Sequence, residues 1–83
     1  MLEVFAVLDK VAMAFMNPFY FHTKGEAHRS FGDAVKDSKT SLAAHPADYE
    51  LYQIGTWNPR DGRIESLKTP NLVCRGSDFI KSE

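Results

Sequence analysis

The first apolar run of the chain, residues 2–8, predicts a β-strand with hydrophobic side chains on both faces. Alternation along the strand gives two sets, one with Val4, Ala6 and Leu8 and the other with Phe5 and Val7. After a two-residue turn at Asp9-Lys10, residues 11–16 fit either a returning strand or a short helix. Asn17-Pro18 ends the pairing because proline has no N–H, and residues 19–21 resume an extended stretch.

A helix is predicted to begin after Thr23. Thr23 and Glu26 have the spacing of a capping box, in which each side chain accepts a hydrogen bond from the other residue's backbone N–H. Apolar residues then recur at helical spacing up to Asp37-Ser38, where the helix ends. This apolar stripe consists of Ala27, Phe31, Ala34 and Val35. Short helical turns are expected near residues 42–44 and after Pro46.

The clearest hairpin joins residues 49–57 to residues 63–67 through a loop that contains Pro59 and Gly62. Alternation along its first strand groups Trp57 with Tyr49, Leu51 and Gln53, on the face opposite Tyr52 and Ile54. Thr69-Pro70 is expected to break the second strand and to leave residues 72–74 as a short edge strand. Residues 1–67 are therefore predicted to form a single domain, followed by a short edge segment and polar C-terminal tail at residues 68–83.

These elements predict an α+β fold, in which a small antiparallel sheet of about four strands has one main helix packed on one face. One helix cannot cover both faces of a sheet. The face that carries Phe5 and Val7 therefore needs another cover, and a second subunit is the simplest one. We expect the protein to form a homodimer.

The composition is that of an ordinary globular domain, with 43% hydrophobic and 25% charged residues in a chain of 83. The net charge is −1 and the pI is about 6.3, which argues against a protein that coats duplex DNA, because such proteins carry a basic face. No stretch reaches the length of a membrane span, and the N-terminus lacks the basic region of a signal peptide. The sequence predicts a soluble protein.

Enzymatic chemistry is not expected. The three histidines, His22, His28 and His45, lack metal-ligand spacing, and the single cysteine, Cys74, has no partner for a zinc site or an intramolecular disulfide. The five glycines form neither a P-loop nor a dinucleotide motif. We therefore expect no catalysis, no metal and no other cofactor. We also expect Cys74 to have no functional role and Cys74→Ser to leave folding intact.

Aromatic and basic residues define a candidate binding site. Rings on a sheet can stack unpaired bases while nearby cations hold phosphates. The candidate nucleic-acid-binding residues are Tyr20, Arg29, Tyr52, Trp57, Arg60, Arg63 and Lys68. The alternative is that the rings belong to the core, since a small domain needs large side chains to bury area. Arg29 is either an exposed contact residue or a solvated partner of Asp33.

Three segments carry a family resemblance: Asn17-Pro18-Phe19-Tyr20-Phe21, residues 25–31 and residues 45–57. They resemble the small nonstructural protein of microviruses, especially of the gokushovirus branch. That family shows a Pro-Phe step, an Ala-x-Arg-x-Phe helix and a His-Pro-x-Asp-Tyr-x-Leu-Tyr-x-Ile-Gly strand. The resemblance covers about residues 4–66. Trp57 stands where the family has phenylalanine, and the tail from Lys68 matches no part of the pattern.

The resemblance implies a nonstructural phage protein that acts in the host cytoplasm on viral DNA replication. By analogy with protein C of the isometric phages, it implies a switch toward single-stranded genome synthesis and packaging, with single-stranded DNA as a candidate partner. It implies no catalytic residues. A different reading is a protein-interaction module that binds the replication initiator or a host replication protein without contacting DNA, and the net charge favours it. An assembly accessory is a third reading, with no motif of its own.

Overall fold

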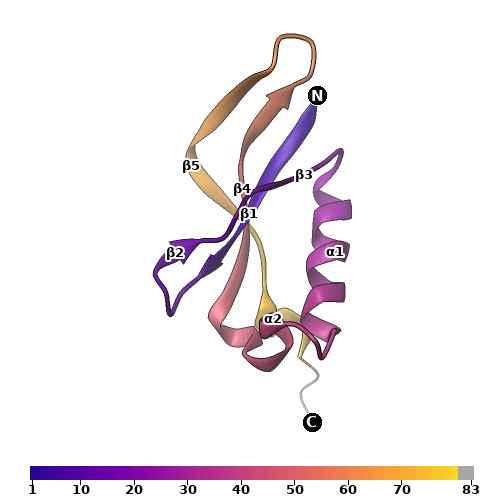
Figure 1. Cartoon of the computed structure of the whole chain (residues 1–83), viewed down its shortest axis with the longest axis vertical. Coiled ribbons are helices and arrows are strands. Elements are labelled where there is room, and N and C mark those ends of the chain that lie inside the picture. Colours follow the sequence, from indigo (N-terminus) through magenta and orange to yellow (C-terminus); the bar gives the residue numbers. More distant parts are fainter. Residues whose placement is uncertain (81–83) are drawn as a thin grey trace.

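The computed structural model describes residues 1–80 and shows one sheet with a long helix beside it (Figure 1). The strands are β1 (Leu2–Asp9), β2 (Ala14–Phe15), β3 (Phe19–Phe21), β4 (Tyr49–Asn58) and β5 (Arg63–Arg75). The helices are α1 (Lys24–Lys36) and α2 (Ser41–Ala44), with the 3-10 turns η1 (Pro46–Asp48) and η2 (Gly76–Phe79). The β4–β5 hairpin projects past the start of α1, so the molecule is elongated, with extents of 47 × 24 × 20 Å.

The sheet is antiparallel, and β1 is its most connected strand. The order β2-β1-β4-β5 accounts for four strands, and β3 also pairs with β1. β3 pairs with the first half of β1, through Glu3–Phe5, and β2 pairs with its last two residues. β4 runs along the whole length of β1. The predicted α+β fold, with an antiparallel sheet of about four strands and one main helix, is confirmed.

The helix α1 forms where the capping signals predict it. The Thr23 hydroxyl accepts from the Glu26 backbone N–H at 3.1 Å, and the Glu26 carboxylate accepts from the Thr23 N–H at 3.0 Å. These two bonds satisfy donors that the first turn leaves open, so they fix the helix start. The predicted end at Asp37 and the short turns α2 and η1 are also confirmed.

The core lies between the sheet and α1. Phe5 and Leu51 are fully buried, and both point from the sheet toward α1, where Ala27 and Phe31 meet them. We call this side of the sheet the inner face. The expectation that Phe5 and Val7 need cover from a second subunit is wrong, because α1 covers the face that carries them.

The opposite side of the sheet is buried by the chain's own rings. Val4 and Ala6 are only 2% and 1% exposed, although α1 lies on the other side. The register aligns Val4 with Tyr20 of β3 and Ala6 with Tyr52 of β4, so rings on the neighbouring strands shield these two small side chains. The hydrophobic second face of β1 is therefore no longer an argument for self-association.

The turn between β1 and β2 differs from the prediction. It contains four residues, Lys10–Met13, rather than two, and β2 is only two residues long. The Asp9 carboxylate accepts from the N–H groups of Val11 and Ala12 at 3.0 and 3.1 Å, which stabilises the wider turn. Met13 has a φ of 58°, in the left-handed region, and ends the turn.

The second hairpin strand is longer than predicted. β5 continues through Thr69-Pro70 to Arg75, so the predicted break is wrong. The pairing skips there: Gln53 aligns with Asn71 and Gly55 with Ser66, which leaves residues 67–70 in a bulge. Pro70 is tolerated for two reasons. β5 is an edge strand, and residues in the bulge do not donate a backbone hydrogen bond to β4. The edge strand expected at residues 72–74 is the end of β5.

The predicted polar tail includes a packed turn. Phe79 of η2 lies against Phe31 and His28 of α1, with ring centroids 6.0 and 5.1 Å apart. The N–H of Arg75 donates to the Asp78 carboxylate at 2.8 Å, which fixes the start of η2. The last three residues of the predicted tail, 81–83, lie outside the described residues.

Gly76 is required for this docking. A Cβ at Gly76 would overlap the Pro46 carbonyl oxygen, which belongs to backbone and cannot rotate away. We expect Gly76→Ala to lower the free energy of unfolding by about 1–3 kcal/mol, as overpacked substitutions do. Urea unfolding followed by circular dichroism measures the change. Gly25→Ala is the matched control, because its nearest neighbour would be 3.9 Å away, and it is expected to be stabilising by about 0.5–1 kcal/mol.

Candidate nucleic-acid interface

Four rings lie on the side of the sheet opposite α1, which we call the aromatic face: Phe15, Tyr20, Tyr52 and Trp57. They form two pairs. The ring centroids of Tyr20 and Trp57 are 6.0 Å apart, and those of Phe15 and Tyr52 are 5.7 Å apart. Tyr20 is 43% exposed and Phe15 is 46% exposed, while Tyr52 and Trp57 are half-buried. The structure thus brings the three predicted rings together and adds Phe15.

A β-bulge places Trp57 on this face. The pairing of β1 with β4 shifts between Val4 and Phe5, so that Phe5 aligns with Gln53 but Val4 aligns with Gly55. The extra residue, Ile54, reverses the alternation beyond it. The prediction that Trp57 shares a face with Leu51 is therefore wrong, and Trp57 joins Tyr52.

The predicted basic residues do not gather around the rings. Arg60 is exposed in the β4–β5 turn, Lys68 is in the bulge of β5, and Arg63 aligns with Asn58 at the start of β5. Because Ile64 aligns with Trp57, alternation turns Arg63 to the other side of the hairpin. Arg29 is on α1, which covers the inner face, so it is separated from the rings by the sheet.

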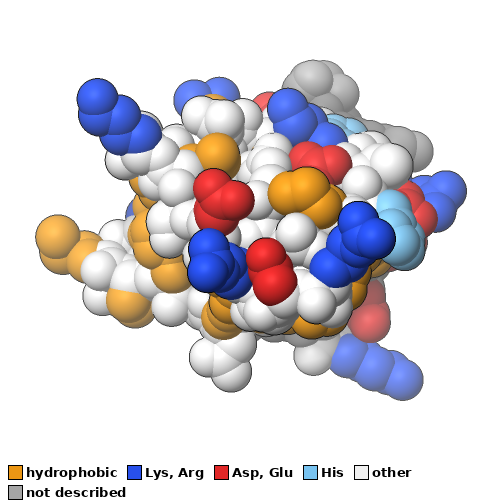
Figure 2. Space-filling model, turned by 90° about the horizontal axis from the view of Figure 1, so that it is seen from above, with side chains coloured by type: hydrophobic (Ala, Val, Ile, Leu, Met, Phe, Trp, Pro, Cys, Tyr) orange, Lys and Arg blue, Asp and Glu red, His pale blue; other side chains and the backbone are white. Residues whose placement is uncertain are grey.

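The end of the molecule that carries the hairpin shows mixed charge. In Figure 2, Lys and Arg side chains are spread around this end with Asp and Glu between them, and hydrophobic side chains are most prominent on the left. The basic side chains in this view therefore form no continuous patch. Any contact with phosphates at this end depends on individual cations.

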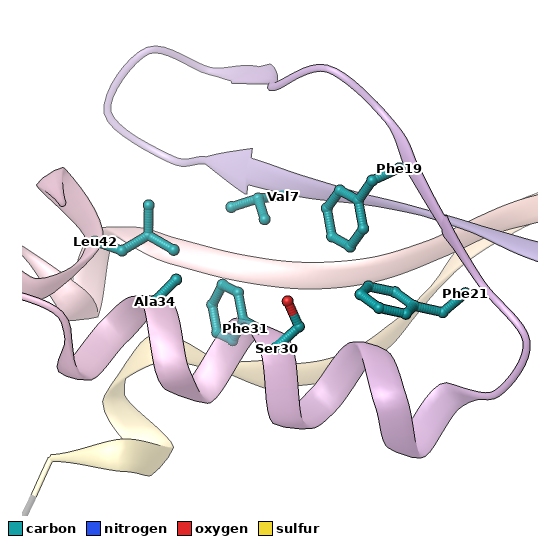
Figure 3. A pocket seen from close by; sticks show the side chains of 7 residues that line it. All are labelled: Val7, Phe19, Phe21, Ser30, Phe31, Ala34 and Leu42. Atoms are coloured by element: carbon teal, nitrogen blue, oxygen red, sulfur yellow. The ribbon is translucent and has the colours of Figure 1, made fainter.

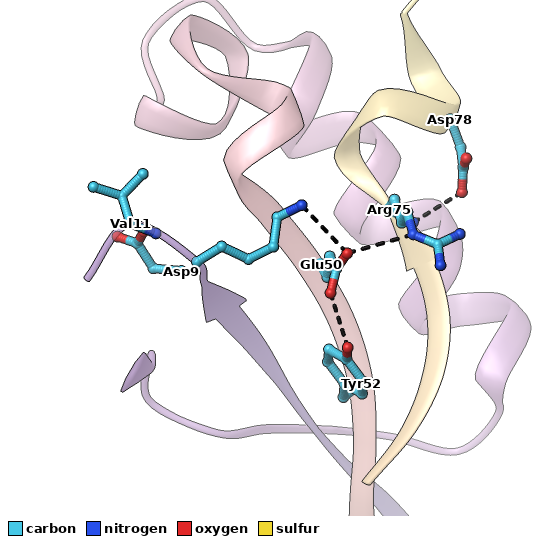
Figure 4. Close-up of polar contacts among 7 residues, drawn as sticks. Asp9, Val11, Glu50, Tyr52, Arg75 and Asp78 are labelled. Atoms are coloured by element: carbon cyan, nitrogen blue, oxygen red, sulfur yellow. Dashed lines mark hydrogen bonds and ion pairs between the residues drawn. The ribbon is translucent and has the colours of Figure 1, made fainter. Parts of the chain in front are cut away.

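A second group of cations, which no sequence motif predicted, lies beside the rings (Figure 4). Nζ of Lys10 and Nε of Arg75 both lie 3.4 Å from Oε2 of Glu50, and the Tyr52 hydroxyl donates to Oε1 of Glu50 at 2.8 Å. We call these four residues the Glu50 cluster. Lys10 follows β1 and Arg75 ends β5, so only the β1–β4–β5 pairing brings them together. Their distance in sequence explains why no motif revealed them.

The cluster shifts the titration of its members. The hydrogen bond from Tyr52 lowers the pKa of Glu50 below its ordinary value, and the charges of Lys10 and Arg75 act in the same direction, against the effect of burial. The same hydrogen bond raises the pKa of Tyr52. Glu50 therefore remains ionised at neutral pH, although the residue is only 9% exposed.

This shift predicts acid sensitivity. The pKa of Glu50 is lower in the folded protein than its ordinary 4.5, so the ionised Glu50 stabilises the fold through its contacts with the cluster. This contribution is fully present above pH 4.5 and is lost as the pH falls through the folded value. Urea unfolding between pH 3 and pH 7 is expected to show a smaller acid-side loss of stability in Glu50→Gln than in the wild type. Equal losses in both proteins would show that other carboxylates cause the acid sensitivity.

Cys74 belongs to the core, where burial raises the pKa of its thiol to about 11. The thiolate is then rare at neutral pH, so we expect a thiol reagent to modify Cys74 only after unfolding. Burial also changes the expectation for Cys74→Ser. A hydroxyl at this position needs a hydrogen-bond partner, and without one the variant is expected to lose about 1–3 kcal/mol of stability. Cys74→Ala is the control, since it buries no polar group; equal losses in both variants would contradict this explanation.

An apolar pocket of about 260 Å³ lies on the inner side, between α1 and the strands (Figure 3). Its lining consists of Val7, Phe19, Phe21, Ser30, Phe31, Ala34 and Leu42. Ser30 supplies the polar side chain of this lining, and no titratable group accompanies it. The volume is below the roughly 300–1,000 Å³ that is usual for small-molecule sites. The pocket therefore does not replace the aromatic face as the candidate site.

The described part of the chain has neither a metal-binding cluster nor a membrane-spanning helix. Within residues 1–80, no group of three or more His, Cys, Asp or Glu side chains is placed to hold a metal ion. Over the same range, no helix has the length and apolar character needed to cross a membrane.

The fold and the site define a small α+β domain with a helix on one side of its sheet and an aromatic layer on the other. A family model described as Phage ORF5 protein matches residues 2–79, which is nearly the whole chain. The protein therefore belongs to this bacteriophage family. No curated protein and no solved structure matches the chain.

Proposed function

We propose that this phage protein is a nonstructural, non-enzymatic protein that acts in the host cytoplasm during viral DNA replication. In this proposal it binds single-stranded viral DNA and favours single-stranded genome synthesis and packaging over further duplex replication. Membership of a phage family supports the viral setting. The microvirus resemblance of the segments around Tyr20 and Tyr52 supports the finer role.

The observation that carries the proposal is the aromatic face. Single-stranded nucleic acids are bound by rings that stack on successive bases together with cations that follow the backbone. Tyr20 and Trp57 form one ring pair and Phe15 and Tyr52 the other, on a side of the sheet that α1 leaves open. Stacking accepts any base, so the proposal requires little sequence preference and weak binding to duplex DNA.

Quenching of the single tryptophan tests this directly. Titration with an oligo(dT) strand at low salt is expected to quench Trp57 fluorescence in a saturable way. The apparent affinity should fall as salt rises, because each phosphate contact releases counterions. A duplex of the same length is expected to bind much more weakly. Absence of quenching and of any other binding signal at low salt would overturn the proposal.

Arg60→Ala and Arg29→Ala form a matched pair of variants. Arg60 is exposed at the tip of the β4–β5 hairpin, whereas Arg29 is on α1, behind the sheet. Both variants lose one positive charge, so a general charge effect would weaken binding equally. We expect Arg60→Ala to weaken binding of oligo(dT) and Arg29→Ala to leave it unchanged.

A protein-interaction module is the second candidate function. The β1–β2 turn exposes apolar side chains, with Val11 at 74% and Met13 at 87% exposure, and exposed apolar groups are common at protein interfaces. In this alternative the partner is a second copy of the chain, the viral replication initiator or a host replication protein. Sedimentation tests the first of these: a dimer that Met13→Ser dissociates would support self-association through this turn, and a monomer at high micromolar concentration would exclude a stable homodimer.

A further inference from the structure

We propose that Lys10 and Arg75 form a phosphate-binding subsite for single-stranded DNA, and that Glu50, which pairs with both cations, competes with the phosphate for them. This inference rests on the proposed binding of single-stranded DNA to the aromatic face. It adds a specific location for the backbone phosphate, at the end of the face that is far from the hairpin tip.

The geometry brings two cations to one point. Lys10 Nζ and Arg75 Nε approach the same oxygen, Oε2 of Glu50, each at 3.4 Å. Lys10 follows β1 and Arg75 ends β5, and both side chains reach Glu50 of β4 (Figure 4). Because both contact one atom, they are also close to each other. A phosphate that approaches from the solvent side would meet both charges.

The two cations are more exposed to solvent than the carboxylate, so a ligand would contact the cations first. The side chains of Lys10 and Arg75 are 45% and 55% exposed, whereas that of Glu50 is 11% exposed. Glu50 contacts Arg75 through Nε, and guanidinium carries further N–H donors that suit phosphate oxygens. Glu50 is thus paired with two cations at once, so its single negative charge cannot neutralise both of them.

Three further acidic residues, Asp9, Asp48 and Asp78, are near the two cations, and two of their carboxylates accept hydrogen bonds from backbone groups. Asp9 accepts from the N–H groups of Val11 and Ala12, and Asp78 accepts from the N–H of Arg75. These bonds fix the two carboxylates in the local turns. Glu50 is therefore the carboxylate that pairs directly with both cations.

The cluster also adjoins a stacking surface. Tyr52 donates its hydroxyl hydrogen bond to Glu50, and its ring packs edge-to-face against Phe15. A base stacked on the Phe15–Tyr52 pair would place its phosphate within reach of the neighbouring cations. Aromatic rings with cations beside them are the combination that binds single-stranded DNA without sequence preference.

Three variants test the subsite in the full-length protein with an oligo(dT) strand. Arg75→Ala and Lys10→Ala are each expected to weaken binding and to make the dependence of log K on log salt shallower by about 0.7 per lost phosphate contact. Glu50→Gln removes the competing charge but keeps an oxygen that can accept from Tyr52. It is expected to tighten binding by about two- to fivefold, which corresponds to the free energy that a surface ion pair usually contributes.

Asp33→Asn is the matched control for Glu50→Gln, because it makes the same change in net charge on α1, behind the sheet. It is expected to leave affinity unchanged, and the melting temperature of each variant verifies folding. If the wild type binds oligo(dT) but all three variants match its affinity and salt dependence, the subsite is wrong and the proposed function stands. If the wild type does not bind, the proposed function fails and the subsite fails with it.

Discussion

Phe5→Ala is expected to lower the free energy of unfolding by about 3–5 kcal/mol, the usual cost of removing a buried phenylalanine. Phe5 has no exposed surface, and its ring lies 6.2 and 6.4 Å from those of Phe19 and Phe21. It also faces α1 across the core, so its loss opens a cavity where β1, β3 and the helix meet. A domain of this size has about 5–15 kcal/mol in total, so the variant should be partly unfolded near physiological temperature.

Thermal and urea unfolding followed by circular dichroism measure the Phe5 effect. Phe15→Ala is the control, since it removes the same side chain from the same sheet. Phe15 is 46% exposed and packs mainly on Tyr52, so we expect a loss of about 0.5–1.5 kcal/mol, the value of one aromatic pair. Equal losses for the two variants would contradict the assignment of the inner face as the core.

Trp57→Ala is expected to weaken the binding of single-stranded DNA by about 1–3 kcal/mol, which corresponds to roughly 5- to 150-fold in Kd. Trp57 is half-buried on the aromatic face and contacts Tyr20, outside the core cluster of the inner face. Its removal should therefore cost less stability than Phe5→Ala. Affinity is the property that should change most.

Fluorescence anisotropy of a labelled oligo(dT) strand measures this affinity without the tryptophan. The melting temperature of the same sample verifies that the variant is folded. Ile80→Ala is the control, because Ile80 is exposed and follows η2, which packs against α1 and not against the aromatic face. A folded Trp57→Ala variant with unchanged affinity would remove the rings from the proposed site, and the protein-interaction function would then lead.

The modest net charge of −1 is compatible with this kind of binding. Stacking on rings contributes affinity that does not depend on charge, so a single-strand binder needs fewer cations than a protein that coats duplex DNA. The Glu50 cluster brings two cations together in a slightly acidic protein. Lys10, which follows β1, and Arg75, which ends β5, converge because both strands pair with β4.

The sequence by itself determined the local elements of this protein. Thr23 and Glu26 are three residues apart, so their capping box requires only local geometry, and the apolar stripe from Ala27 to Val35 follows from the helical repeat. The β4–β5 hairpin was equally predictable, because its turn depends on neighbouring residues such as Pro59 and Gly62.

The tertiary structure decided which faces these elements bury. Alternation shows that Phe5 and Val4 point to opposite sides, but only the packing of α1 decides that Phe5 is inside. The bulge in β4 depends on pairing with β1 and reverses the side on which Trp57 lies. Pro70 is accommodated because β5 is at the sheet edge, and Lys10 meets Arg75 only through strands that are distant in sequence. Such long-range pairing has no local signal, which is the physical reason that sequence patterns do not reveal it.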